Sequence, residues 1–362
     1  MISSRQLFFT IALARISALL VLLPVVQSGD ARQDAWIAVI LATAASVVIV
    51  YLGTYLASRY PEKSLGHFAS DLLGKPMGTI VTCLLALSFY ALCLIRTRLM
   101  SLVLISHFMR RTPGWALAVP VLLTAMYGAM NGPDTVGRAS EFLFTIMIMI
   151  IVGALIMSCI WGIDRVGGLR PVLSRGLRPV LAASVPATFL GLVSGLQVLA
   201  LGRFTVDKRR MTRAAALALI VSGLVLLAVT IDVLTTLGPT QAQMYVTPVL
   251  ALASSIFIEG TLERLDLVLM ASWLLGITFD VTTLLMSSAI LIGNSFRLDY
   301  RKVAFVLTLL GIVPVSHRFT DIFTMRRLHS IPVTGIWSVV IVAGTLMPVL
   351  IAHLLRQRKG GS

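Results

Sequence analysis

The sequence predicts an all-α integral membrane protein with about ten transmembrane helices. Of its 362 residues, 57% are hydrophobic and only 12% are charged, about half the charged share of a soluble domain. The apolar residues form consecutive stretches of roughly the 20 residues that a helix needs to cross a bilayer. No polar segment between them is long enough to form a core of its own. We therefore expect a single transmembrane domain over residues 1–362.

The apolar stretches fix the order of the expected spans. They lie near residues 7–27, 35–57, 77–106, 115–130, 139–162, 183–202, 214–237, 264–292, 302–316 and 333–355. The third span is longer than a bilayer requires, so we expect it to be tilted. The fourth and ninth are short.

The segment 240–259 breaks this pattern. Gln241, Gln243 and Thr247 interrupt its apolar residues, and Pro248 disfavours a continuous helix. We interpret it as a short outer helix or a re-entrant segment. An eleventh span is the alternative.

The basic residues between the spans set the orientation. Lys and Arg are more frequent in the segments that would be cytoplasmic if both chain ends are cytoplasmic, although the basic loop 163–182 opposes this bias. Ten spans with both ends on one side fit two five-helix repeats of opposite orientation, about 7–162 and 183–355. In secondary transporters built this way, the first helix of each repeat is broken at a binding site halfway through the membrane.

Small residues occur at equivalent depths of the first and sixth spans. They are Ser17 and Ala18 in the first, and Gly191, Ser194 and Gly195 in the sixth. Small side chains let the backbone unwind and face a ligand, which predicts a broken helix in each repeat. Close helix packing is the alternative, because Gly191 and Gly195 form a GxxxG pair.

Several charged residues lie within or at the ends of the spans, where an unpaired charge is costly. Arg15 is central in the first span, Asp280 is central in the eighth, and Asp232 is near the end of the seventh. The others are Arg96 and Arg98 in the third span, and Glu263, Arg264 and Asp266 at the start of the eighth. Each either serves ligand binding, proton transfer or a conformational step, or forms a structural ion pair between helices.

Other function classes lack support in the sequence. There is no nucleophile elbow, zinc-protease, P-loop or dinucleotide motif, so we expect no enzyme and no cofactor. The three cysteines have no metal-ligand spacing. The net charge of +15 is explained by loops next to anionic lipid, and nucleic-acid binding would need a basic face on a soluble fold.

Short sequence motifs, each of which is weak evidence alone, occur one after another through most of the chain. They are Leu23-Pro24, Gln33-Asp34-Ala35-Trp36, Tyr60-Pro61, Lys63-Ser64-Leu65, Leu73-Gly74-Lys75, Thr97-Arg98, Thr112-Pro113, Val136-Gly137-Arg138, Leu169-Arg170-Pro171-Val172-Leu173, Gly176-Leu177, Phe189-Leu190-Gly191, Leu262-Glu263-Arg264-Leu265-Asp266 and Trp273. Together they resemble the B subunit of bacterial spore germinant receptors, the GerAB-type family.

This resemblance implies a fold, a location and partners. The family belongs to the amino acid–polyamine–organocation superfamily, whose LeuT-like fold is a five-plus-five inverted repeat. Its members lie in the inner membrane of the endospore, beside a membrane-embedded A subunit and a lipoprotein C subunit. The B subunit is implied to bind a small nutrient, often an amino acid, and to pass a change of conformation to its partners.

We expect the nutrient to bind between the first, third, sixth and eighth spans, because small residues occur at equivalent depth in the two halves. The residues expected to bind it are Ile16, Ser17, Ala18, Tyr90, Arg96, Gly191, Ser194 and Gly195. Arg98, Arg138, Glu263, Arg264 and Asp266 are assigned to architecture or subunit coupling.

This chain departs from the family pattern at three positions. Ser17-Ala18-Leu19 replaces a sequence that usually contains glycine, and Val193 and Arg96 stand where acidic residues are common. These departures predict either a ligand other than a simple α-amino acid or weak recognition of one. Two other functions stay open: an ion-coupled amino-acid transporter with Asp280 or Asp232 as the proton carrier, and a structural or channel-like subunit.

Overall fold

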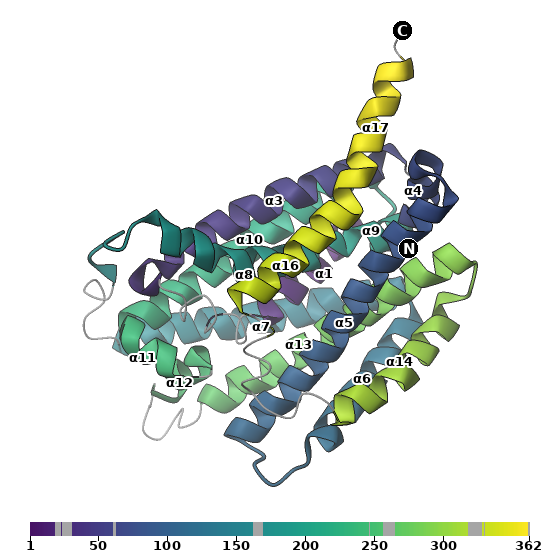
Figure 1. Ribbon diagram of the computed structural model, residues 1–362. Coiled ribbons are helices and arrows are strands. Elements are labelled where there is room, and N and C mark those ends of the chain that lie inside the picture. The colour runs from purple at the N-terminus through teal and green to yellow at the C-terminus, as the bar shows by residue number, and fades with distance from the viewer. Residues whose placement is uncertain are drawn as a thin grey trace.

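The protein is a bundle of long helices in the computed structural model (Figure 1). The structure describes residues 1–18, 23, 31–60, 63–161, 169–245, 247–255, 265–317, 328 and 330–360. Within these residues, eight helices are long and apolar enough to cross a membrane. They correspond to the expected spans two to eight and ten. The chain is therefore an all-helical, multi-pass membrane protein.

The first half of the chain contains five of the expected spans and one short helix. Its elements are α1 (Ser4–Ser17), η1 (Arg32–Asp34), α3 (Ala35–Arg59), α4 (Leu65–Leu73), α5 (Lys75–His107), α6 (Gly114–Asn131) and α7 (Pro133–Trp161). Gly132 has a φ of 92°, a conformation that glycine adopts without strain. It lets the chain turn directly from α6 into α7.

The second half of the chain begins after the basic loop. Its elements are α8 (Leu177–Leu196), α9 (Val198–Leu201), η3 (Gly202–Phe204), α10 (Lys208–Thr236), α11 (Gly238–Met244), α12 (Pro248–Ser255), α13 (Leu265–Phe296), α14 (Tyr300–His317), α16 (Ile331–Ile341), η4 (Val342–Leu346) and α17 (Met347–Gly360). The short π-helical turn η4 lies between α16 and α17.

The described part of the segment 240–259 contains no helix long enough for an eleventh span. It contains the end of α11, a helix of 7 residues, and α12, a helix of 8 residues. Both are too short to cross a bilayer. Pro248 opens α12, where its missing N–H costs nothing. The expectation of short helical structure here is confirmed.

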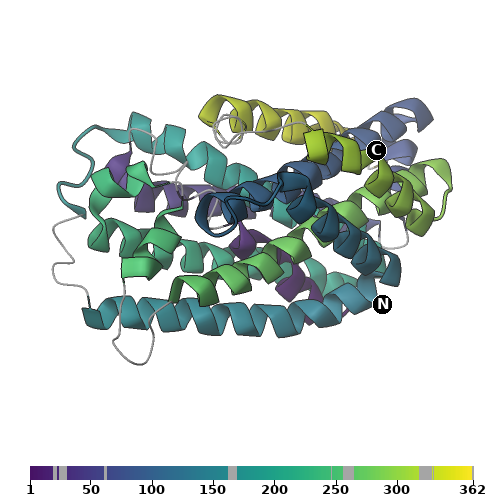
Figure 2. The same cartoon turned by 90° about the horizontal axis from the view of Figure 1, so that it is seen from below.

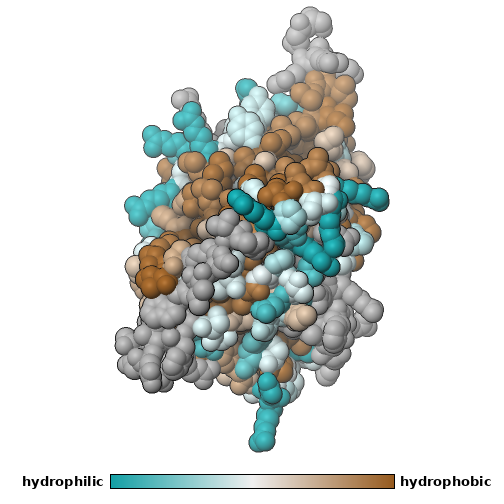
Figure 3. Space-filling view, turned by 90° about the vertical axis from the view of Figure 1, so that its left-hand side faces the viewer, coloured by the Kyte–Doolittle hydropathy of each residue, from teal (hydrophilic) through white to brown (hydrophobic). Residues whose placement is uncertain are grey.

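Helices α8 and α13 form the centre of the bundle, and most of their residues are buried. Helix α13 packs against α5, α6 and α14, while α8 packs against α3 and α16. In contrast, α7 runs along the edge (Figure 2), and few of its residues are buried. Large apolar side chains such as Leu87 and Ile160 are exposed, and apolar residues also gather on the surface in Figure 3, as a bilayer-embedded exterior requires.

The start of α1 lies beside the end of η3. The Ile2 N–H donates to the Phe204 carbonyl at 2.9 Å, and the Val206 N–H donates to the Ile2 carbonyl at 3.0 Å. Helix α1 begins at this end of the bundle, and the α8–α9 segment ends there. Helices α1 and α8, which we call the two lead helices because each is the first of an expected repeat, therefore run antiparallel.

The two lead helices end differently. Helix α1 stops at Ser17, with Ala18 as its cap, where the sequence predicts a break. Helix α8 instead continues as regular helix through Gly191, Ser194 and Gly195 and is interrupted only at Gln197. The prediction of a break at these three residues is wrong. The reason is packing: Gly191 and Gly195 let α3 approach the backbone closely.

Candidate functional site

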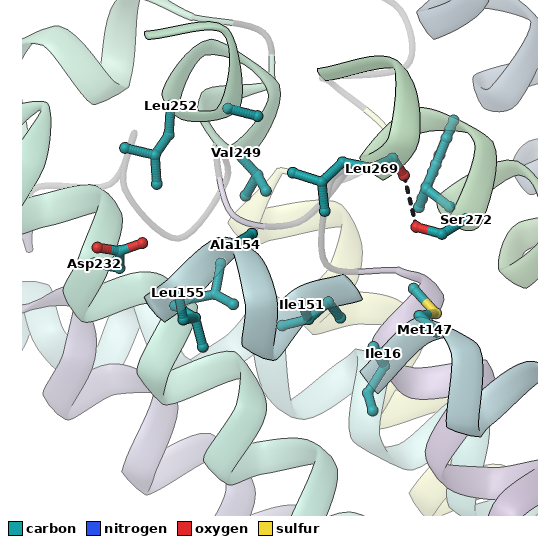
Figure 4. Close-up of a pocket in the computed structure, with 13 residues that line it drawn as sticks. Ile16, Met147, Ile151, Ala154, Leu155, Asp232, Val249, Leu252, Leu269 and Ser272 are labelled. Carbon is teal, nitrogen blue, oxygen red and sulfur yellow. Dashed lines mark hydrogen bonds between the residues drawn. The ribbon is translucent and has the colours of Figure 1, made fainter. Parts of the chain in front are cut away.

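A cavity of about 50 Å³ lies where α1, α7, α10, α12 and α13 meet (Figure 4). Its walls are almost entirely apolar. They consist of Ile16, Met147, Ile151, Ala154, Leu155, Val229, Asp232, Val249, Leu252, Ala253, Leu269, Ser272 and Trp273. Since one water needs about 10–15 Å³ of such space, the cavity has room for a few waters or a small guest.

Among the described residues that line the cavity, Asp232 alone carries a carboxylate. Its side chain comes from α10 and is 7% exposed. Asp232 Oδ1 accepts hydrogen bonds from Ser158 Oγ at 2.6 Å and from Thr236 Oγ1 at 3.4 Å. Figure 4 shows Asp232 on the far side of the cavity from Ile16 and Met147. Among the described residues, the cavity thus has one polar end and one apolar end.

The end of α1 is fastened to α13 beside this cavity. A helix leaves its last carbonyl groups without helical partners. Here the Trp273 Nε1–H donates to the Ser17 carbonyl at 2.6 Å, and the Trp273 side chain is buried. Ile16, next to Ser17, lines the cavity together with Trp273. A guest in the cavity would therefore touch the broken end of α1 and the helix that holds it.

The glycines of α8 lie away from this cavity, against α3. A Cβ added to Gly191 would be 2.3 Å from Ser46 Oγ, and one added to Gly195 would be 2.4 Å from Val50 Cγ2. Such distances mean direct contact between α8 and α3, as the packing interpretation of the GxxxG pair requires. Neither glycine lines the cavity.

The other residues expected to bind a ligand are dispersed. Ala18 packs against Leu190 of α8, and the Ser194 hydroxyl donates to the Leu190 carbonyl at 3.1 Å within α8. The Tyr90 hydroxyl donates to the Leu307 carbonyl of α14 at 2.7 Å. Of the eight residues expected, Ile16 alone lines the cavity, and Ser17 adjoins it through its carbonyl.

Arg96 and Asp280 form a buried ion pair between α5 and α13. Arg96 Nε lies 3.7 Å from Asp280 Oδ2, and the two side chains are 2% and 4% exposed. Arg96 Nε and Nη1 have no hydrogen-bond partner among the described residues. The sequence assigned Arg96 to ligand binding and left Asp280 open between a functional charge and a structural ion pair, and the structure places the two side chains against each other.

Arg15 is also buried, but its hydrogen-bond partners are neutral groups. Its side chain is 1% exposed. Nη1 donates to the Leu219 carbonyl, and Nη2 donates to Thr43 Oγ1 at 3.0 Å. No carboxylate in the described part of the chain forms an ion pair with it. Arg15 thus joins α1 to α10 and α3 through neutral acceptors.

Of the remaining predicted charges, Arg98 lies within α5, and Arg138 and Asp266 lie in the first turns of α7 and α13. Arg98 lies against Gly114 at the start of α6. Arg138 is exposed and pairs with Asp134 in the first turns of α7 at 3.2 Å. Asp266 is the second residue of α13. Glu263 and Arg264 lie outside the described residues.

Sequence reasoning missed most of the cavity wall. Met147, Ile151 and Ala154 of α7, and Val249 and Leu252 of α12, belong to it. Their apolar character matches that of residues facing lipid, so no sequence signal separates the two. The described residues contain no cluster of three or more His, Cys, Asp or Glu residues able to hold a metal ion.

The fold has solved relatives. It is similar to Mhp1, a nucleobase-cation-symport-1 family transporter, with a TM-score of 0.63 and 11% identity over 89% of this chain and 74% of that one. It is also similar to MhsT, solved in complex with L-phenylalanine, with a TM-score of 0.60 and 15% identity over 98% of each chain. The manganese transporter of Eremococcus coleocola gives a TM-score of 0.65 and 13% identity over 95% of this chain and 78% of that one. The chain therefore shares the fold of these membrane transporters.

Sequence comparison specifies the family. Residues 1–324 match the family model described as spore germination protein, and the chain belongs to this family. Spore germination protein KB of Bacillus subtilis is 27% identical over 301 residues, which cover 82% of this chain and 79% of that protein. Spore germination protein GerLB of Bacillus cereus is 22% identical over 337 residues, covering 91% and 88%.

Proposed function

We propose that this protein is the B subunit of a spore germinant receptor and that it senses a small nutrient within the membrane. Family membership supports the role in germination, and the transporter-like fold supports ligand recognition. The observation that carries the sensing role is the cavity at the end of α1, where Trp273 Nε1 donates to the Ser17 carbonyl.

The mechanism follows from which elements the cavity touches. Its walls come from five helices, so a guest that fits one arrangement of α1 and α13 better than another shifts the population of the two. In this proposal, the change passes to A and C subunits in the inner membrane of the endospore. The coupling free energy equals the difference between the free energies of ligand binding to the two states.

We also propose that the bundle is a five-plus-five inverted repeat with halves near 7–162 and 183–355. Packing partners support this relation. Helix α1 contacts α10 and α7, and α8 contacts α3 and α16. Each lead helix thus packs on the second span of the opposite half and on the fifth span of its own. A short helix also separates the second and third spans of each half, α4 in one and α11–α12 in the other.

Filling the cavity tests the sensing role. Ala154→Leu adds bulk to the cavity wall, whereas Gly153→Leu adds greater bulk at the next residue of α7, where a Cβ meets open space. We expect Ala154→Leu to reduce nutrient-triggered germination at normal protein levels, and Gly153→Leu to leave it unchanged. A normal nutrient response of the Ala154→Leu spores would show that the cavity is not the sensor.

Ion-coupled transport is the second candidate, and the buried Arg96–Asp280 pair favours it. A buried carboxylate next to a cation can exchange its partner for a proton during a transport cycle. Uptake of radiolabelled amino acids into proteoliposomes, with and without a pH gradient, separates the two functions. Accumulation driven by the gradient would support transport, and its absence would support sensing alone.

A further inference from the structure

The chain segment that leads into α8 is fastened to η1, just before α3. The Leu173 N–H donates to Asp34 Oδ1 at 3.0 Å, and Asp34 is buried. Gln33 Nε2 donates to the Pro171 carbonyl at 3.0 Å and to Ser174 Oγ at 2.9 Å. These three hydrogen bonds hold the segment in place, although nearly all of its residues are exposed.

Arginines occupy this fastened surface. Arg170, Arg175 and Arg178 are exposed on the segment, and Arg32 is exposed on η1. We call these four residues the arginine face. None of them forms an ion pair within the part of the chain that the structure describes. Because like charges on two fastened segments repel one another, an anionic partner would stabilise this arrangement.

Exposed apolar side chains alternate with the arginines along the segment. They are Val172, Leu173 and Leu177. Leu177 also begins α8, which is long and apolar enough to span a membrane, so these side chains lie near the membrane boundary. At that depth, apolar side chains reach the acyl chains of a lipid while arginines reach its phosphate group. A soluble acidic protein would match the charges but not the apolar side chains beside them.

The arginine face lies at the opposite end of the bundle from the N-terminus. Helix α8 starts at this face and leads to η3, where the Phe204 carbonyl accepts a hydrogen bond from the Ile2 N–H. The distribution of Lys and Arg favours a cytoplasmic N-terminus. The arginine face is then on the side of the membrane where short loops usually carry few basic residues. Its charge therefore runs against the general rule and calls for an anion at the same place.

We infer that the arginine face binds a phospholipid with a net negative headgroup, such as phosphatidylglycerol, in the adjacent leaflet. The arginines bind the phosphate group, because a guanidinium can donate two parallel hydrogen bonds to it. Val172, Leu173 and Leu177 contact the acyl chains. Since the face joins the starts of α3 and α8, the bound lipid would help to hold these two helices together. This inference goes beyond the proposed function and does not rest on it.

A local reporter tests the preference for anionic lipid. On a background without the three cysteines, Val172→Cys is labelled with a fluorophore, and the full-length protein is placed in nanodiscs with equal shares of phosphatidylglycerol and phosphatidylcholine. One lipid or the other carries a nitroxide quencher near its headgroup. We expect phosphatidylglycerol to be enriched about fivefold, as attraction of even one arginine to anionic lipid would give, and less so at high salt. Val339→Cys is the control, because Val339 is exposed on α16, which has no charged residue. It should show no enrichment.

A charge variant identifies the residues responsible. Arg175→Gln with Arg178→Gln should lower the enrichment at Val172→Cys about twofold or more, because half of the charge of the face is lost. Arg213→Gln with Arg297→Gln is the matched control, since both arginines are exposed but lie outside the face; it should keep the enrichment. An unchanged enrichment in the first variant would contradict the assignment. If that variant does not fold, the lipid comparison and its salt dependence on the native arginines still decide.

The same reporter distinguishes lipid from other occupants. Equal quenching by the two lipids at Val172→Cys would overturn the inference. A soluble polyglutamate peptide that changes the fluorescence, while the two lipids quench equally, would assign the face to an acidic protein instead. Enrichment that inorganic phosphate at millimolar concentration leaves unchanged would support binding of the whole lipid.

Discussion

Buried tryptophans illustrate how single residues stabilise this bundle. Trp273 Nε1 donates to the Ser17 carbonyl, so one bond satisfies both a buried donor and a helix-end acceptor. Trp36 Nε1 is also buried but has no hydrogen-bond partner among the described residues. A buried polar group that loses its partner costs more free energy than one that never had one. The two side chains should therefore respond differently to the same substitution.

We predict that Trp273→Phe lowers the free energy of unfolding by about 1–3 kcal/mol more than Trp36→Phe does, because it leaves the Ser17 carbonyl unsatisfied. Thermal unfolding of the two purified variants measures the difference. Equal losses would mean that the bond between α13 and α1 contributes nothing to stability.

The Arg96–Asp280 pair gives a second prediction at this scale. Arg96→Met and Asp280→Leu should each destabilise the protein by about 3–5 kcal/mol, since each leaves an uncompensated buried charge. The double variant should lose less than the sum of the two single losses. A double-mutant cycle of unfolding measurements checks this, and simple additivity would show that the two charges do not interact.

At the scale of the helix, close approach decides where a small residue serves packing. Gly191 and Gly195 lie one turn apart on α8 and face Ser46 and Val50 of α3. The small residues that suggested an unwound helix therefore form a flat surface against which α3 packs. Gly153 of α7 has open space at its Cβ position, so the same residue type has no packing role there.

We predict that Gly191→Ala and Gly195→Ala each destabilise the protein by about 1–3 kcal/mol, because the added methyl group overpacks the contact with α3. Gly153→Ala should be neutral or stabilising by up to about 1 kcal/mol, as expected for an exposed helical position. Thermal unfolding midpoints of the three variants test this. Stable Gly191→Ala and Gly195→Ala proteins would indicate that α3 and α8 can separate without cost.

For the whole molecule, the main question is how the two halves are related. Figure 1 shows α4 at the opposite end of the bundle from α11 and α12. These short helices follow the second span of their halves. In an inverted repeat, equivalent elements lie on opposite faces of the membrane. The bridge between Ile2 and Thr205 places the N-terminus on the same face as the loop before α10.

Cysteine labelling tests this relation. On a background without Cys83, Cys93 and Cys159, we predict that Lys75→Cys and Val206→Cys react with a membrane-impermeant maleimide from one side and Gln241→Cys from the other. All three positions are exposed. Labelling of Lys75→Cys and Gln241→Cys from the same side would contradict the inverted repeat.

The sequence predicted the spans well and the site poorly. The expected spans 35–57, 77–106 and 115–130 match α3, α5 and α6 to within two residues at each end, because the apolar length of a span is a local property. The break after Ser17 and the unusual position of Asp232 were also visible. The sequence did not reveal the cavity walls from α7 and α12, because a residue that faces a cavity and one that faces lipid are equally apolar.

The sequence by itself determined the class of protein, the order of its helices and its family, because these depend on composition and on motifs along the chain. Only the tertiary structure decided which buried groups meet: Trp273 with Ser17, Arg96 with Asp280, and α8 with α3. The physical reason is that a membrane helix is apolar on every side. Its sequence therefore carries little information on which face packs, which meets lipid and which borders a cavity.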